Sequence, residues 1–304
     1  MTSPDLPAEL KAALDRKAEG LSQTDAARRA VAISENYRGG GGSNPIKTEM
    51  DALAYALARM PATYAAIIAC LNALRDQIPA FEPQSLLDVG AGPGTASWAA
   101  AQNFETLAEF MALDANPALR SLALSLVTDS RLSSLSYERG EALKAIHDTQ
   151  ACDLVIASYV IGEIGEDSRA SLVTAMWQKT KHILLIVEPG TPAGYERIIA
   201  ARSQLISEGA NVVAPCPHDD SCPLTPPNWC HFSQRLPRSR AHKHLKGADL
   251  PFEDERFSYV TLSRIPSAHR PARVLSQPLR TKVAVTAKLC TENGLKTPIL
   301  AHRD

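Results

Sequence analysis

The chain has 304 residues, of which 45% are hydrophobic and 21% are charged, and its formal net charge is −1. This length can bury the core of one large domain or of two unequal ones. No run of about 18 apolar residues is present, so we expect no membrane partner. Residues 1–20 include four acids and lack the apolar core of a signal peptide. We therefore expect a monomeric, cytoplasmic protein, in which clustered cysteines favour a metal site over disulfides.

The small net charge conceals an asymmetry along the chain. Residues 231–304 hold 14 Lys and Arg against 6 Asp and Glu, a net charge of +8, whereas residues 1–230 hold 18 against 27, a net charge of −9. A basic C-terminal quarter favours a polyanionic partner such as nucleic acid. A solvated basic surface fits the charge alone equally well.

Residues 4–80 are predicted to be helical, with apolar side chains repeating at helical spacing. The glycine-rich stretch 38–45 predicts a flexible break after the second helix. A third helix is expected over 48–60, and a fourth from Pro61 onward, because proline is favoured at the first helical position. Arg59 is therefore expected in the turn between them, where it either borders a cofactor or only shapes the turn.

From residue 85 short apolar strands alternate with helical segments, which predicts a parallel sheet covered on both faces. The expected strands are 85–89, 109–114, 133–138, 152–158 and 182–188. After about residue 210 the chain becomes rich in proline, and two late strands are expected over 256–264 and 282–290. We therefore divide the chain into an N-terminal helical region (1–80), a core (81–210) and a C-terminal region (211–304).

The strongest motif is the glycine loop LLDVGAGPGTASWAA at residues 86–100. A buried strand leads into Gly90, Gly92 and Gly94, and glycine lets the backbone turn sharply and approach a ligand closely. A dinucleotide-binding fingerprint requires a third glycine where this chain has Thr95. Asp88 precedes the loop, and its carboxylate opposes a phosphate but suits a ligand that carries an amino group.

Over residues 85–190 this pattern resembles the class I S-adenosylmethionine (SAM) methyltransferases. The resemblance implies an α/β, Rossmann-like, doubly wound sheet and a SAM cofactor held by the glycine loop. It places Asp114 on the ribose hydroxyls, Glu141 beside the adenine, and Ser158 and Tyr159 where substrate and methyl group meet. These residues follow strand ends, which is where open α/β sheets bind ligands. The alternative is a tight strand–helix turn without a ligand.

Methyl transfer also requires a group that positions the substrate and removes a proton. The chain has no N-P-P-Y-like stretch and no Pro-Cys nucleophile after the fourth expected strand. Glu188 ends the fifth expected strand and either faces a substrate or serves as a structural acid. The catalytic residues are unknown, and we leave open whether the protein is an enzyme.

The loop CPHDDSCPLTPPNWCHF at residues 216–232 holds three of the six cysteines: Cys216, Cys222 and Cys230. Their spacing matches neither a zinc ribbon nor the cysteine triplet of radical-SAM enzymes. Proline after a cysteine is common in iron–sulfur loops, and soft thiolates suit either iron–sulfur or zinc. The fourth ligand has to come from elsewhere, with Cys290, His218 and His231 as candidates. The alternative is a set of unliganded thiols.

The cysteine loop, the basic segment after it, the late cysteine and the stretch 54–67 together resemble the methyltransferase-like assembly factors of the small ribosomal subunit. The resemblance covers about residues 50–295. It implies a 4Fe-4S cluster on Cys216, Cys222, Cys230 and Cys290, with zinc as the alternative metal. It also implies binding to small-subunit ribosomal RNA in assembly or translation, with rRNA methylation left open. The competing hypotheses are a non-catalytic factor that uses SAM and the cluster structurally, and a zinc-bearing methyltransferase of a small molecule or protein.

Five cations follow the cysteine loop and are candidates for neutralising RNA phosphates: Arg235, Arg238, Arg240, Lys243 and Lys246. The alternative is a solvated helix face. The acids of the segment 252–257 are expected to pair with these cations locally.

Overall fold

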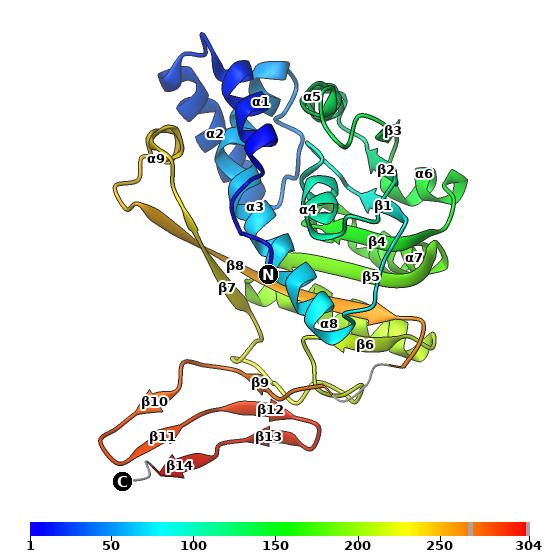
Figure 1. The fold of residues 1–304 in the computed structure, drawn as a ribbon, viewed down its shortest axis with the longest axis vertical. Coiled ribbons are helices and arrows are strands. Elements are labelled where there is room, and N and C mark those ends of the chain that lie inside the picture. The colour runs from blue at the N-terminus through cyan, green and yellow to red at the C-terminus, as the bar shows by residue number, and fades with distance from the viewer. Residues whose placement is uncertain (267–269, 302–304) are drawn as a thin grey trace.

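A mixed β-sheet forms the centre of the molecule in a computed structural model that describes residues 1–266 and 270–301 (Figure 1). Its strands are β1 (Ser85–Val89), β2 (Glu109–Asp114), β3 (Ser136–Arg139), β4 (Cys152–Ser158), β5 (Thr180–Pro189), β6 (Asn211–Ala214), β7 (Phe232–Pro237) and β8 (Phe252–Ser263). The order is β3-β2-β1-β4-β5-β8-β6, and β7 pairs with β8 beside this path. Strands β1 to β5 are parallel, whereas β8 runs antiparallel to its three partners. The expected α/β sheet is confirmed, and β6, β7 and β8 of the C-terminal region complete it.

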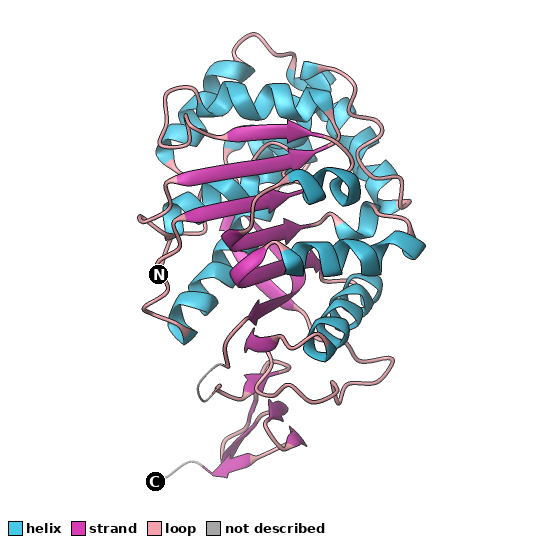
Figure 2. Cartoon of the chain, turned by 90° about the vertical axis from the view of Figure 1, so that its right-hand side faces the viewer, coloured by secondary structure: helices cyan, strands magenta, loops and turns pink. Residues whose placement is uncertain are grey.

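Helices cover both faces of the sheet, as Figure 2 shows. They are α1 (Ala8–Ala18), α2 (Gln23–Arg38), α3 (Glu49–Gln77), α4 (Thr95–Asn103), α5 (Pro117–Val127), α6 (Ala142–Ala145), α7 (Glu166–Gln178), α8 (Pro192–Ser207) and α9 (Arg240–Lys246), with short 3-10 helices η1 (Ile146–Asp148) and η2 (Ile161–Glu163). One apolar cluster joins α1 to α5 to one face of the sheet, and a second joins α6, α7 and α8 to the other. Helices on both faces make the sheet doubly wound. Because β1, β2, β4 and β5 are parallel, their carboxyl ends lie at the same edge of the sheet.

Helix α3 is continuous over 29 residues and contains Pro61 in its interior. The expected turn at this point, with Arg59 in it, is therefore wrong. A proline inside a helix costs about 3 kcal/mol, but 15 side chains of α3 are buried, and this packing outweighs the local cost. Among the described residues α3 is the one helix long and apolar enough to cross a membrane by length and composition, and most of it is buried in the protein.

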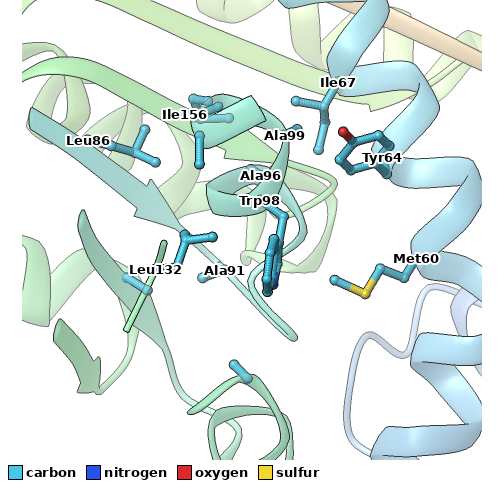
Figure 3. Packing of buried hydrophobic residues seen from close by; sticks show 14 of the residues in the cluster. Met60, Tyr64, Ile67, Leu86, Ala91, Ala96, Trp98, Ala99, Leu132 and Ile156 are labelled. Carbon is cyan, nitrogen blue, oxygen red and sulfur yellow. The ribbon is translucent and has the colours of Figure 1, made fainter. Parts of the chain in front are cut away.

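Trp98 shows how α4 is locked between the sheet and α3. It is 1% exposed, and Figure 3 places it between Ala91, just after β1, and Met60 of α3. Burying an aromatic side chain of this size contributes about 2–3 kcal/mol. The glycine loop is therefore held by a packed helix behind it.

The last described residues leave the body and form two small antiparallel sheets, seen at the foot of Figure 1. One has the order β10-β11-β14 and the other β13-β12-β9. Their strands are β9 (Arg273–Val274), β10 (Leu279–Arg280), β11 (Ala284–Thr286), β12 (Leu289–Thr291), β13 (Gly294–Lys296) and β14 (Ile299–Ala301). The single strand expected over 282–290 is wrong, because its two halves belong to different sheets.

Candidate cofactor and metal sites

The glycine loop adopts backbone angles that ordinary residues avoid. Gly90, Gly92 and Gly94 have φ values of +71°, +54° and +81°, in the region that glycine enters without steric cost. A Cβ atom on Gly90 would lie 2.3 Å from Cγ2 of Val160. The loop therefore needs glycine for its turn, and at Gly90 also for a close approach to the chain after β4.

Asp88 lies at the end of β1 and is completely buried. Its Oδ2 accepts hydrogen bonds from the backbone N–H (3.0 Å) and the hydroxyl (2.8 Å) of Ser97. Its Oδ1 has no hydrogen-bond partner among the described residues. Burial raises the pKa of Asp88 to about 7. A buried polar atom without a partner is costly, so a ligand that donates a hydrogen bond here, such as an amino group, fits the site.

Asp114 ends β2 and holds the glycine loop from the neighbouring strand. Its Oδ2 accepts a hydrogen bond from Gly92 N (2.9 Å), and its Oδ1 accepts one from Asn116 N (2.7 Å). Burial raises the pKa of the carboxyl despite these bonds. The structure thus brings Asp88, Asp114 and the glycines together, and a carboxylate oxygen has further lone pairs for a ribose hydroxyl.

The other residues expected near the cofactor differ in their surroundings. Glu141 follows β3, but its side chain is exposed and its carboxylate lies 2.5 Å from Nζ of Lys144. Ser158 ends β4 as expected, and Tyr159, expected beside it, has the positive φ of +59°. Strained backbone of this kind clusters at ligand sites. The structure therefore favours Tyr159 over Ser158 as a ligand contact.

A cavity of about 770 Å³ opens beside the ends of β4 and β5, between α2, α3 and α9. Its wall includes Tyr37, Tyr55, Arg59, Tyr159, Glu163 and Arg197. The rings of Tyr37 and Tyr55 stack with centroids 5.7 Å apart. Burial, and to a smaller extent the nearby Asp114 carboxylate, raises the pKa values of Tyr55 (to about 12) and Glu163. The cavity is lined by Tyr159, whose neighbour Val160 lies against Gly90. It has the size of a small-molecule site.

The polar groups on the floor of this cavity are already paired. Glu188 is 1% exposed; its Oε2 pairs with Nε of Arg197 at 2.6 Å, and its Oε1 accepts a hydrogen bond from Ile161 N. The Tyr159 hydroxyl donates to Glu255 (3.0 Å), which also pairs with Arg59. Sequence reasoning missed Glu255, because it lies on β8, 196 residues from Arg59, and no local pattern connects them. Neither Glu188 nor Tyr159 is placed as a free general base.

The glycine-rich segment expected as a flexible break is tied to the cofactor edge. Ser43 N donates to Oε2 of Glu163 at 3.0 Å, and Nδ2 of Asn116 donates to the carbonyl of Ile46 at 2.9 Å. Ile46 is buried in the apolar cluster. The segment therefore forms one wall of the site next to Asp114.

The four cysteines expected as metal ligands surround one cavity below the sheet. Cys216, Cys222, Cys230 and Cys290 all line it, and each is a free thiol. Burial raises the pKa of Cys216 and of Cys290 to about 11, and nearby cysteines add to the rise. In the part of the chain that is described, no group of three His, Cys, Asp or Glu side chains is placed to hold a metal ion. The structure thus brings the four thiols to one cavity without showing a metal centre.

Two arginines line the same cavity. Arg202 on α8 is 1% exposed and donates from Nη2 to the carbonyl of His218 (2.7 Å); Arg273 donates to the carbonyl of His231 (3.0 Å). Their Nε atoms are buried and have no hydrogen-bond acceptor among the described residues. The guanidinium groups oppose the rise in the pKa values of Cys216 and Cys230. Two cations, each with an unpaired Nε donor, beside four thiols fit an anionic thiolate–metal group.

The alternative fourth ligands lie beside this cavity. His218 is buried, and its Nε2 lies 3.5 Å from Sγ of Cys290. His231 packs against Trp229, whose indole N–H donates to the carbonyl of Gly190. Of the three candidates Cys290 is the one that lines the cavity with the other cysteines.

The basic segment after the cysteine loop is largely neutralised by acids of β8. Arg235 forms two 2.8 Å hydrogen bonds to Asp254, and Glu253 pairs with both Arg238 and Lys246. This agrees with the local pairing expected from the sequence. Lys243 forms no ion pair with the residues described, and the side chain of Arg240 lies outside the description.

Comparison with known families identifies the chain. The family model described as mitochondrial small ribosomal subunit Rsm22 matches residues 49–303, most of the sequence. The chain belongs to the Rsm22 family. Its fold is a Rossmann-like α/β fold with N-terminal helices, in the strand order given above.

Curated relatives of this Rsm22 family member are mitochondrial proteins. The human mitochondrial ribosome assembly protein METTL17 is 31% identical over 81% of this chain and 57% of its own length. The Rsm22-cox11 tandem protein 2 of Schizosaccharomyces pombe is 26% identical over 71% of this chain and 32% of its own length. The chain thus spans about half or less of these relatives. Their mitochondrial descriptions contradict the cytoplasmic location expected from the N-terminus.

The chain is also similar to solved structures at low sequence identity. Magnesium protoporphyrin IX methyltransferase of Synechocystis with bound SAM is 10% identical with a TM-score of 0.44, covering 81% of this chain and 99% of that one. A putative RNA methyltransferase of Pyrococcus horikoshii is 13% identical with a TM-score of 0.43, covering 66% and 81%. Neither likeness carries an argument about function.

Proposed function

We propose that this Rsm22 family member is a SAM-binding protein with a four-cysteine iron–sulfur site, and that it binds small-subunit ribosomal RNA during assembly of the small ribosomal subunit. Family membership supports the assembly role, since METTL17 is described as a ribosome assembly protein. The single observation that carries most of the proposal is the joining in one chain of a SAM-type glycine loop and a cavity lined by four cysteines.

Three features support SAM as the ligand of the glycine loop. The unpartnered Oδ1 of Asp88 suits the amino group of the cofactor, and Asp114 suits the ribose hydroxyls. The positive φ values of the three glycines give the tight turn that a SAM-binding loop requires. The 770 Å³ cavity beyond Tyr159 then lies where a substrate would meet the methyl group.

The four cysteines would hold the iron–sulfur cluster, with Cys290 joining the C-terminal extension to the body. When bound, the cluster would supply a structural crosslink between segments far apart in the sequence. Arg202 and Arg273 would donate from Nε toward the thiolates and offset their charge. Zinc on the same thiolates is the alternative.

The chemistry of the cavity favours binding over methyl transfer. Glu188 and Tyr159, the acid and the phenol nearest the strand ends, are engaged by Arg197 and Glu255. We therefore favour a non-catalytic assembly factor as the function of this protein. The second candidate function is methylation of an rRNA nucleotide, which the size of the cavity and its stacked tyrosine pair favour.

Calorimetric titration with SAM tests the cofactor proposal. We expect one site per chain, and Asp88→Asn should weaken binding by about tenfold or more, since a hydrogen bond to a charged group contributes about 1.5–3 kcal/mol. Asp129→Asn, which changes an exposed acid, is the matched control. Absence of SAM binding by the unaltered protein, or equal affinity in both variants, would overturn the assignment. Transfer of labelled methyl groups from SAM to small-subunit RNA would favour an rRNA methyltransferase over a non-catalytic assembly factor.

A further inference from the structure

The positive charge of the C-terminal quarter is distributed unevenly between its elements. On β7, α9 and the connection between them, three of the five expected RNA cations pair with Glu253 or Asp254. Arg235 is also stacked on Phe252, with its Cζ 4.0 Å from the ring centroid. Charges paired in this way hold β7 and α9 on β8 and leave little net potential for a polyanion.

The two small C-terminal sheets have the opposite balance. Residues 270–301 contain six Lys and Arg and one acid, Glu292. Arg270 pairs with Asp219, and Arg273 faces the cysteine cavity. The other four form no ion pair with any residue in 1–266 or 270–301: Arg280, Lys282, Lys288 and Lys296.

The strand register shows which face of the sheet β13-β12-β9 is free. Cys290 lies opposite Leu295 and Arg273, and this face carries the thiol of the cysteine cavity. Leu289 lies opposite Lys296 and Val274 on the other face, because successive side chains in a strand alternate. Lys296 is exposed. The inner face therefore anchors the sheet to the body, and the outer face presents a cation to solvent.

The sheet β10-β11-β14 lies farther from the body, as Figure 1 shows, and mixes cations with exposed apolar side chains. Arg280 lies opposite Val285, which pairs in turn with Leu300. Leu279, Val283, Ile299 and Leu300 are 64–73% exposed. A monomeric protein rarely leaves such apolar side chains together on one small element, so the extension has the properties of a contact surface.

We propose that the two C-terminal sheets, β9 to β14, form the surface that binds ribosomal RNA phosphates, with Arg280, Lys282, Lys288 and Lys296 as the contacting cations. The inference rests on the proposed RNA-binding function and names the surface that performs it. Four cations without ion-pair partners near a single acid favour a polyanion over a protein or a second copy of this chain. The exposed aliphatic side chains then pack on sugars and bases beside the phosphates.

The test compares two variants that each lose four positive charges. The sheet variant is Arg280→Gln, Lys282→Gln, Lys288→Gln and Lys296→Gln. The control variant is Lys11→Gln, Arg16→Gln, Lys17→Gln and Lys47→Gln, all exposed residues of the N-terminal region. The probe is small-subunit ribosomal RNA transcribed in vitro, and its affinity is measured over a range of salt concentrations. The double variant Arg235→Ala and Arg238→Ala tests the competing site on β7.

We expect the sheet variant to bind RNA at least about tenfold more weakly. The slope of log affinity against log salt should become shallower by up to about 3, since each lost phosphate contact contributes about 0.7 on a single strand. The control variant should keep both the affinity and the slope. Circular dichroism and SAM affinity should match the unaltered protein in all variants.

Three results would overturn the inference while leaving RNA binding in place, and the first two concern RNA affinity. One is unchanged RNA affinity in the sheet variant. The other is a loss of RNA affinity confined to the Arg235 and Arg238 variant, which would place the RNA contact on β7. Self-association that Ile299→Ser and Leu300→Ser abolish, with RNA affinity unchanged, would also overturn it, because the surface would then join two copies. Failure of the unaltered protein to bind RNA would instead overturn the proposed function itself.

Discussion

Asp88 is a buried carboxyl whose protonation changes near neutral pH. One oxygen bonds to Ser97 and the other has no partner among the described residues, while burial raises its pKa to about 7. In the folded protein without ligand, Asp88 keeps its proton up to about pH 7, whereas in the unfolded chain it loses the proton near its ordinary pKa of 3.8. This group therefore reduces stability as the pH rises from about 4 to 7.

The affinity for SAM should follow the ionisation of Asp88. An amino group prefers the carboxylate, so binding below pH 7 has to release the proton at a cost of about 1.4 kcal/mol per pH unit. We expect SAM affinity to fall by up to tenfold per pH unit below about pH 7 and to level off above it. Titration at several pH values measures this, and Asp88→Asn should remove the dependence. A flat profile in the unaltered protein would contradict a direct contact with Asp88.

Single residues also show the limits of sequence reasoning. Asp88, the glycines and Asp114 were predicted from a local motif, and the four cysteines from their loop and the family resemblance. Arg202 and Arg273 were not predicted, because helix α8 and strand β9 approach the cysteines only in the fold. Glu255 was missed for the same reason: its partners Arg59 and Tyr159 lie on other elements.

Among the elements, buried apolar strands were predicted most accurately. Strands β1, β2 and β4 lie where they were expected, because a continuous apolar run has one way to be buried in a parallel sheet. Helix α3 was divided at Pro61, since the packing that holds it straight is not visible locally. The segment 282–290 was merged into one strand, because its alternation continues through the change from β11 to β12.

The cysteine loop and the C-terminal sheets should depend on Cys222 more than the α/β core does. Cys222→Ser removes one proposed ligand while keeping the shape of the side chain, and Ser221→Ala at the neighbouring exposed position is the control. Trypsin should cleave the variant after Arg280, Lys282 or Lys288 about tenfold faster for every 1.4 kcal/mol of local stability lost. Fragments from residues 1–207 should appear no earlier than in the control. Equal sensitivity of both halves would contradict a local metal crosslink.

At the scale of the whole molecule, two cavities and a C-terminal extension occupy different places. The large cavity lies beside the ends of β4 and β5, whereas the four cysteines line a second cavity. Figure 1 shows the two small C-terminal sheets extending away from the body. Cys290, Arg273 and Arg270 attach this extension to the body. In the proposed function, the cysteine site would crosslink this extension to the body, and the extension would contact RNA.

The most direct test of this account is the metal content and absorption spectrum of the protein purified without air. We predict a brown protein with broad absorption near about 400 nm and four iron and four sulfide per chain, lost in a variant with Cys216, Cys222 and Cys230 changed to serine. A colourless protein that contains one zinc and no sulfide would contradict the iron–sulfur assignment.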